Sequence, residues 1–496
     1  MRRRLFVRPV VCRARPALLA SCLLLGLSAC SLSGGSSADA PRKRPPANGM
    51  TIRVTTLTTA PTSAPGEARV TVTARLINVG QDAEPLRPSD VSLLAASGIS
   101  YAPSGVSDPP SALSGPLAPG ATRDVRLAFQ LPSAAVPRGC LFYHSGGGES
   151  VCARLDASAT TTITQHPLDE GGGYPWGMVA DDAGNLWFAE PGCDFPLGCA
   201  ASTPPGHIGV WLAASGRVVS YPLPDLPGNQ PLFLALGPGG AIWFTTPNNS
   251  MIGAFNPQTR QVIGQWPVIP DSGPWALAFS GNTLWYTENF ISGIGAFDIA
   301  THTFHDVATP SPNSSPYGIA ASGDHIWFTE NSSAVARIGM LDSSAGHTIV
   351  EYPIHAGSAT NLTPHLIAVD AHGHPWWTEG STRAIATLDP AAATPGRCSV
   401  AAGDCPGIRE FALPPAPSSC PNAHASAIAI GPDGTLWLTD SLAGQVGSFN
   451  PATRQFTLYP LDDCNAHAHD GLALDGDGHV WWTEEFAGQV GELRQD

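Results

Sequence analysis

The sequence of 496 residues has few charged side chains and, beyond Lys43, no lysine at all. Charged residues make up 13% of the chain, about half the usual share for a soluble protein. A chain with a formal net charge of −15 and almost no lysine offers no basic face to a phosphate backbone, so nucleic acid is not an expected partner. The same lack excludes catalysis through a lysine Schiff base.

Disorder is not expected, because 43% of the residues are hydrophobic and 13 Trp can build large cores. The 53 Gly and 48 Pro divide the chain into short segments, which is typical of all-β proteins. A chain of this length is expected to form two or three domains.

The one targeting signal lies at the N-terminus. Residues 1–30 combine six Arg, an apolar run over 17–27 and small residues before Cys30, which predicts a lipoprotein signal peptide with a lipobox and acylation of Cys30. The alternative is a plain signal peptide with an incidental cysteine. Because the run is too short to span a bilayer, we expect an extracytoplasmic protein held at a membrane by its lipid alone, with 31–49 as a flexible linker.

Eight further cysteines follow Cys30, and an even number in an exported chain indicates disulfides. Three pairs are close in sequence, and the remaining two cysteines occupy equivalent positions in adjacent repeats. The predicted pairs are Cys140–Cys152, Cys193–Cys199, Cys398–Cys405 and Cys420–Cys464.

Residues 50–157 are predicted to form a β-sandwich. Val70, Val72, Ala74 and Leu76 alternate with polar residues, as in a half-buried strand, and six or seven such strands fit into about 110 residues. The phrases LINVG, PSDVSL and LAPGATRDVRLAFQLP resemble Ig-like domains of bacterial lipoproteins. No catalytic constellation is visible here, so a spacer or adhesion role is expected.

Residues 158–496 are a repeat. A phrase of the form Trp-aromatic-Thr-acid follows an aliphatic strand and a turn seven times, with Trp at 187, 243, 285, 327, 376, 437 and 481. Each unit holds four short strands, which predicts a seven-bladed β-propeller of four-stranded blades. The strand TTITQHPL at 161–168 is expected to complete the last blade and close the ring.

The repeated pattern P-x-G-I-A, W-F-T-E, I-G-x-F and Y-P-L resembles the virginiamycin B lyase (streptogramin lyase) family over 158–496. That resemblance implies a seven-bladed propeller closed by an N-terminal strand. It also implies a magnesium cofactor and the opening of cyclic depsipeptide lactones by elimination.

The Trp and acid of each phrase are expected to be structural, and function is expected where the repeats differ, at the start of the inner strands. At the position two residues before the aliphatic residue of each inner strand, the first four blades carry apolar or aromatic side chains. Of these, Trp176, Trp275 and Tyr317 are predicted to form a ligand wall. Polar residues cluster in the last three blades. The candidates for acid–base catalysis are His365, His424, His467 and His469, and those for metal binding are Asp470 and Glu485. The alternative is that these histidines are solvent-facing turn residues.

Compared with the family, this chain departs at several positions. Antibiotic lyases carry His two residues before the aliphatic in the last two blades, where counting finds Ser426 and Asp470 here. The lyases carry Glu four residues before the aliphatic residue of the last blade, where counting finds Ala468 here. Their second Glu, four residues after the last Trp of the repeat, is matched by Glu485. We therefore expect a monomer that binds a small molecule or a protein partner at the channel mouth without antibiotic-lyase activity. The alternative is a magnesium-dependent lyase or hydrolase that opens a cyclic or lactone-like molecule; the seven Trp phrases disfavour a six-bladed lactonase.

Overall fold

The computed structural model describes residues 50–495 with short gaps. The gaps are 63, 65, 79, 81, 96–99, 108–112, 133–139, 145–149, 156–160, 169–172, 196–198, 200–202, 355–361, 394, 396–405, 417–419, 421–422 and 462–465. The predicted signal peptide, Cys30 and the linker lie outside the described residues. In the part that is described, no helix is long and apolar enough to cross a membrane. Its helices include four of three residues each: η1 (Pro88–Asp90), η3 (Pro238–Gly240), η4 (Pro247–Asn249) and η5 (Ser441–Ala443).

The first part of the described chain forms two main sheets around one hydrophobic core. One sheet has the order β1 (Met50–Pro61), β2 (Glu67–Asn78), β8 (Thr122–Pro132) and β6 (Gly105–Ser107), and β3 (Glu84–Leu86) pairs with β7 (Gly115–Leu117). The other contains β5 (Ser100–Tyr101), β4 (Val91–Leu94), β9 (Cys140–His144) and β10 (Ser150–Arg154). The alternation read in β2 is confirmed, since Val70, Val72, Ala74 and Leu76 are fully buried. The Ig-like assignment itself stays a prediction.

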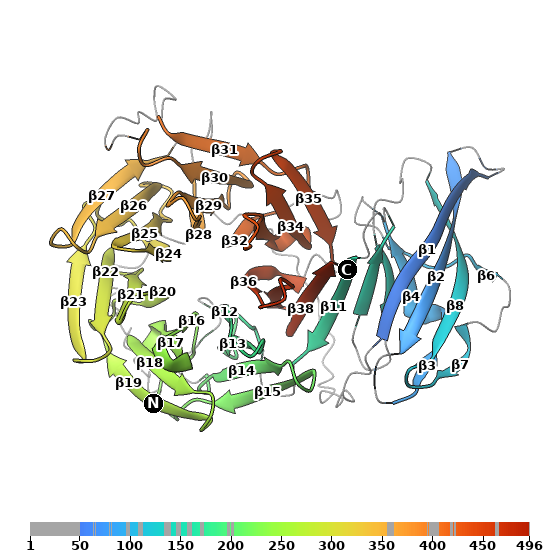
Figure 1. Cartoon of the computed structure of the whole chain (residues 1–496), viewed down its shortest axis with the longest axis horizontal. Coiled ribbons are helices and arrows are strands. Elements are labelled where there is room, and N and C mark those ends of the chain that lie inside the picture. The colour runs from blue at the N-terminus through green and yellow to red at the C-terminus, as the bar shows by residue number, and fades with distance from the viewer. Residues whose placement is uncertain are drawn as a thin grey trace, which may run out of the picture. The chain divides into compact units, whose positions relative to one another are not determined.

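The rest of the chain forms four-stranded antiparallel units, seven of them in the described residues, here called blades 1 to 7 (Figure 1). Blades 1 to 3 are β12 (Met178–Ala180), β13 (Leu186–Glu190), β14 (His207–Leu212), β15 (Arg217–Pro222); β16 (Leu234–Leu236), β17 (Ile242–Thr246), β18 (Met251–Asn256), β19 (Gln261–Pro267); and β20 (Pro274–Ser280), β21 (Thr283–Glu288), β22 (Gly293–Asp298), β23 (Thr303–Ala308). Blades 4 and 5 are β24 (Pro316–Ser322), β25 (His325–Glu330), β26 (Arg337–Asp342), β27 (Thr348–Pro353); and β28 (Pro364–Val369), β29 (Pro375–Glu379), β30 (Ala384–Leu388), β31 (Ile408–Ala412). Blade 6 is β32 (Ala425–Ile430), β33 (Leu436–Asp440), β34 (Gln445–Asn450), β35 (Gln455–Pro460), and blade 7 is β36 (Ala468–Leu474), β37 (Val480–Glu484), β38 (Gln489–Gln495) and β11 (Thr161–Pro167).

The blades follow one another around a ring, with the first strand of each innermost (Figure 1). Each inner strand contacts the inner strand of the next blade, and β36 of blade 7 contacts β12 of blade 1. The strand predicted to complete the last blade does pair with β38, from Thr161 opposite Gln495 to Pro167 opposite Gln489. Its other edge pairs with β10, so one eight-stranded sheet runs from β36 to β5.

The Trp-aromatic-Thr-acid strands hold the ring together, as expected from their repetition. Every residue of β13, β17, β29, β33 and β37 is buried. The Thr hydroxyl reaches the next blade: Thr245 donates to the carbonyl of Trp275 at 2.7 Å, and Thr287 to that of Tyr317 at 2.8 Å. In blades 1, 5 and 7 the Trp ring nitrogen donates to an Asp in the preceding turn. These contacts explain the motif structurally.

The buried acids that end these strands make the free energy of unfolding depend on pH. Burial, as the largest cause, raises the pKa of Glu288 to about 7 and the pKa values of Glu330 and Glu379 to about 8. A carboxyl whose pKa is higher in the folded than in the unfolded protein stabilises the fold while it is protonated, and this contribution is lost as the pH rises through the folded pKa. The propeller should therefore be less stable at alkaline than at neutral pH.

We expect the melting temperature to fall between about pH 5 and pH 8, from the unfolded to the folded pKa values, by roughly 2–4 °C for each kcal/mol lost. Calorimetry on the Glu330→Gln/Glu379→Gln double variant should show a flatter profile over this range, because the amides do not ionise. The matched control is Glu67→Gln, at an exposed position in β2. If the double variant shows the same fall of melting temperature with pH as the unaltered protein, Glu330 and Glu379 are not the cause of that fall.

Candidate functional site

The start of each inner strand is fixed by a hydrogen bond from the preceding blade. Thr329 donates to the carbonyl of His365 at 2.6 Å, and Thr378 donates to that of Ser426 at 2.5 Å. The corresponding bond into blade 7 runs from Thr439 to the carbonyl of His469 at 2.6 Å, not to Asp470. His469 therefore takes the backbone position that His365 and Ser426 take in their blades.

The cause is an extra residue in β36. In blade 4, Pro316 pairs with Glu330 and Ile319 with Phe328, whereas in blade 7 Ala468 pairs with Glu484 and Leu472 with Trp482. Along the inner strand, the two paired residues are three positions apart in blade 4 and four positions apart in blade 7. The result is a β-bulge, in which two residues occupy the room of one and a side chain is re-aimed.

Counting back from Leu472 was therefore wrong for the residues before the bulge. His469, rather than Asp470, corresponds to the family His of the last blade, and His467, rather than Ala468, corresponds to the family Glu. The backbone confirms this equivalence: His467 has φ +59°, and Ser315 and Gly273, two residues before the same position in blades 4 and 3, have φ +49° and +60°.

Asp470, the extra residue, is the centre of a buried hydrogen-bond network. Its Oδ2 accepts from the Tyr317 hydroxyl at 2.5 Å, and its Oδ1 lies 3.0 Å from Nε2 of His365. The Asn331 amide donates both to the Pro364 carbonyl and to Nδ1 of His365, at 2.8 and 3.2 Å. Because Nδ1 accepts, Nε2 carries the proton and donates to Asp470. Burial opposes the charge of Asp470, but His469 and His365 outweigh it and hold its pKa below the usual range.

A second cluster surrounds Glu485 on the turn after β37. Nδ1 of His467 lies 2.7 Å from Glu485 Oε2, and Nδ1 of His469 lies 3.8 Å from the same oxygen. Burial raises the pKa of Glu485 to about 9, and the nearby carboxyls of Asp194 and Asp470 add to the effect. Burial also lowers the pKa of His467 to about 4 and that of His469 well below its ordinary value. Both imidazoles are therefore neutral at pH 7.

His424 enters the same region from blade 6. Its ring lies edge-on to His365, with the centroids 5.1 Å apart, and its Cε1 passes 2.0 Å from the place where a side chain on Gly380 would begin. Burial and the nearby His365 lower its pKa to about 3. All four predicted catalytic histidines thus meet at one end of the channel.

The predicted apolar wall lies beside them. Trp275 and Tyr317 pack with ring centroids 5.4 Å apart, and Trp176 packs edge-on to His469 at 5.0 Å. Around this buried wall, exposed aromatic rings form a rim: Phe290, 53% exposed, contacts Trp275, and Phe486, 49% exposed, stacks on His467. We call these side chains and the two clusters the mouth. The mouth thus combines apolar rings with polar, titratable groups.

Asp194 and Asn331 were not foreseen. Asp194 follows Cys193 in a loop closed by the Cys193–Cys199 disulfide, which is confirmed together with Cys140–Cys152. Cys420 is disulfide-bonded, but Cys398, Cys405 and Cys464 lie outside the described residues, so the pairs Cys398–Cys405 and Cys420–Cys464 stay predictions. The only sequence signal for Asp194 was its place in that loop.

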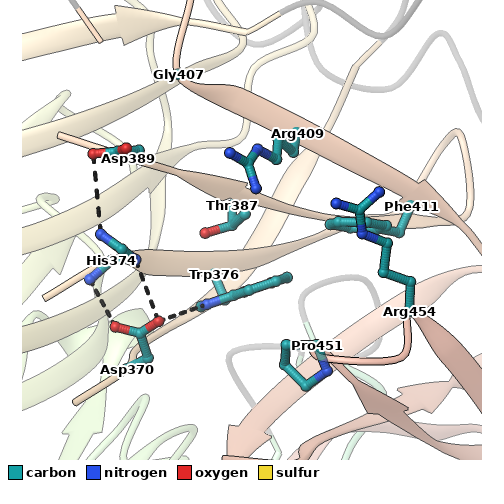
Figure 2. A pocket seen from close by; sticks show the side chains of 10 residues that line it. All are labelled: Asp370, His374, Trp376, Thr387, Asp389, Gly407, Arg409, Phe411, Pro451 and Arg454. Carbon is teal, nitrogen blue, oxygen red and sulfur yellow. Dashed lines mark hydrogen bonds and ion pairs between the residues drawn. The ribbon is translucent and has the colours of Figure 1, made fainter. Parts of the chain in front are cut away.

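A separate pocket of about 250 Å³ lies at the other end of blades 5 and 6 (Figure 2). It contains the guanidinium groups of Arg409 and Arg454, and His374 lies between Asp370 and Asp389, 3.6 and 4.0 Å away. The turn that carries Asp370 joins β28 to β29, whereas the mouth lies at the opposite ends of these antiparallel strands. The pocket is thus distinct from the mouth.

Comparisons with known proteins agree with this geometry. The model of the virginiamycin B lyase family matches residues 201–398. A streptogramin B lyase structure has a TM-score of 0.54 at 23% identity, covering 68% of this chain and 98% of that one. Selenomethionine-substituted virginiamycin B lyase from Staphylococcus aureus gives the same score and identity, covering 67% and 99%. A catalytically inactive His-to-Ala variant of that enzyme, with quinupristin, is 22% identical with a TM-score of 0.54 and covers 67% and 99%. No curated protein sequence matches.

The fold and these matches define a class. Residues 161–495 form a seven-bladed β-propeller, counted over the described strands. The propeller is virginiamycin B lyase-like.

The magnesium implied by that resemblance does not fit the residues present. Magnesium takes oxygen ligands, and the place of one family Glu is held by the imidazole of His467. Glu485 supplies the remaining carboxylate, while both oxygens of Asp470 already accept hydrogen bonds. Among the described residues, the potential metal-binding groups at the mouth are rich in histidine and do not include Asp470.

Proposed function

We propose that the propeller binds a cyclic, ester-containing small molecule with a largely apolar body at the mouth and opens it by elimination. The observation that carries the proposal is the position of His469. The bulge gives His469 the register position at which the resemblance implies a histidine, which supports the proposal, and its Nδ1 is buried without a hydrogen-bond partner among the described residues.

The residues of the mouth suit each part of such a step. A neutral His469 could take the proton from the carbon beside the ester C–O bond; the electron pair then forms a C=C bond and the carboxylate leaves. Asp470, whose Oδ1 lies 3.7 Å from Nε2 of His469, would stabilise the resulting imidazolium. Trp176, Trp275 and the rim of Phe290 and Phe486 would hold the apolar body.

The test is turnover of a streptogramin B probe followed by mass spectrometry and chromatography. Elimination gives a ring-opened product of unchanged mass, whereas hydrolysis adds the mass of water. His469→Ala should lower kcat by about 10²–10⁴-fold, the usual contribution of a general base. The control is His372→Ala, whose side chain is 82% exposed on the other end of blade 5. Turnover that survives in His469→Ala would contradict the assigned base.

A second candidate is binding without turnover, as expected from the sequence. It is favoured by Ser426, which stands in blade 6 where the lyases carry histidine and is fully buried. In that case the probe would bind, with a dissociation constant raised by replacement of Trp176, and no product would form.

We further propose that the chain is an extracytoplasmic lipoprotein, supported by the Leu-Ser-Ala-Cys sequence at 27–30 and by the two disulfides. In a host that processes lipoproteins, Cys30→Ser should move the protein from the detergent-extracted membrane fraction to the soluble fraction. The control is Cys22→Ser, within the apolar run. An unchanged distribution of the Cys30 variant would refute acylation at this residue.

A further inference from the structure

Two groups of histidines at the mouth bring potential metal ligands within 4.8 Å of one another. One consists of His365, His424 and His469, and the other of His467, His469 and Glu485. Since His469 belongs to both, only one group can use it at a time. The hydrogen bonds of the other members decide which group has ligand atoms to give.

In the first group, His365 has no ring nitrogen available as a metal ligand. His365 uses Nδ1 to accept from Asn331 and Nε2 to donate to Asp470. A metal ligand needs a lone pair, and both ring nitrogens of His365 are engaged. This histidine positions Asp470 and is not available to an ion.

In the second group the potential ligand atoms converge on one another, and the one hydrogen bond they make, between Nδ1 of His467 and Glu485 Oε2, lies within the group, so that an ion can replace it. The distances from Glu485 Oε2 to Nδ1 of His467 and of His469 are 2.7 and 3.8 Å. Ligand bonds of about 2.0–2.2 Å in a tetrahedral site separate ligand atoms by roughly 3.3–3.5 Å, which lies between the two values. Nδ1 of His469 is buried and has no hydrogen-bond partner among the described residues. Glu485 itself is 1% exposed.

The donor types select the ion. Two imidazoles and one carboxylate are typical of zinc and other divalent transition metals, whereas magnesium takes oxygen ligands and dehydrates reluctantly. We propose that the mouth binds a divalent transition-metal ion of the zinc class through His467, His469 and Glu485, where the family resemblance implies magnesium. The inference shares His469 with the proposed function: a neutral imidazole has one lone pair, so His469 cannot bind the ion and act as the base at the same time. Ion binding at the mouth does not require turnover.

Asp194 supports these ligands from outside. Its carboxyl lies close enough to Glu485 to affect its pKa, and the Cys193–Cys199 disulfide holds its loop. Hydrogen-bonded carboxylates beside a metal ligand fix its orientation. Three protein ligands would leave a fourth position for a substrate oxygen or water.

The experiment uses the whole chain, freed of metal by a chelator, and calorimetric titration with Zn²⁺ or Mg²⁺ alone. We expect one Zn²⁺ for each chain, bound at least about 100-fold more tightly than Mg²⁺, and a Co²⁺ form with the visible absorption of a four-coordinate site. His467→Ala and Glu485→Gln should each lose about 100-fold or more in Zn²⁺ affinity, and Asp194→Asn about 10-fold.

Two variants sharpen the test. His467→Glu restores the carboxylate pair of the family and should move the preference toward Mg²⁺. His479→Ala is the control, since His479 belongs to a distinct group with Asp475 and Glu492 at the other end of blade 7 and its loss should leave Zn²⁺ binding at the mouth unchanged. Thermal unfolding of each metal-free variant shows whether it is folded.

The outcomes separate the two proposals. Zn²⁺ binding that depends on His467 and Glu485, without turnover of the streptogramin probe, supports the metal site and counts against the elimination. Turnover by the chelated protein supports the elimination and shows that this reaction does not require a metal ion. Zn²⁺ affinity equal to that for Mg²⁺, or unaffected by both His467→Ala and Glu485→Gln in folded protein, overturns the metal site.

Discussion

Replacing residues 161–167 by a Gly/Ser segment of equal length should abolish cooperative unfolding of the propeller. The strand β11 pairs along its whole length with β38 and on its other edge with β10. It also contributes fully buried Ile163, and the Gln165 amide donates to both carboxylate oxygens of Glu484 at 2.8 and 2.9 Å. Without β11, β38 becomes an unpaired edge and the buried Glu484 carboxylate loses one of its donors, keeping those from Trp482 and Gln489.

The measurement is differential scanning calorimetry together with the soluble yield. The matched control is the same replacement in β23, over Thr303–Ala308. That strand is also the outermost of its blade, but it pairs with β22 alone and is mostly exposed. The β23 variant should remain folded with a modestly lower melting temperature. A β11 variant as stable as the β23 variant would show that the ring is held elsewhere.

Asp470→Ala should strongly destabilise the mouth. The change leaves the Tyr317 hydroxyl and Nε2 of His365 buried without an acceptor, at about 1–3 kcal/mol for each group. Relief of a buried charge offsets part of this loss. Because His469 adjoins Asp470 in the bulge, any activity or ligand binding that depends on His469 should fall as well.

The comparison variant is Tyr317→Phe, which removes one hydroxyl and one hydrogen bond and should cost about 1 kcal/mol. Chemical denaturation of both variants gives the two free energies of unfolding. If Asp470→Ala costs no more than Tyr317→Phe, Asp470 is not the centre of the network.

The sequence predicted the propeller well because its determinants are local and repeated. Each Trp phrase carries its own buried strand and its turn, and in blades 2 to 6 a Thr bond to the next blade, so seven copies define seven blades. The pairing of β11 was predictable because blade 7 lacked an outer strand and TTITQHPL had no blade of its own.

The mouth was predicted only in outline. Histidines and acids near the last inner strands could be grouped by position. The sequence did not show where the extra residue of β36 lies, and so which residues precede it. The segment His467-Ala-His-Asp470 has no apolar alternation to mark an extra residue, so counting from Leu472 and counting from Glu484 give different answers. Asp194 was beyond reach because it comes from blade 1, almost three hundred residues earlier, and meets Glu485 only when the ring forms.

The shared last blade also fixes the order of events during synthesis. Residues 161–167 leave the ribosome more than three hundred residues before their partner at 489–495. Until then β11 has β10 as its neighbour and a free edge, and the residues of blades 1 and 7 that form the mouth cannot meet. The mouth can therefore assemble only after blade 7 has been synthesised, and a chain truncated before β38 would carry every histidine of the site without the strand pair that brings them together.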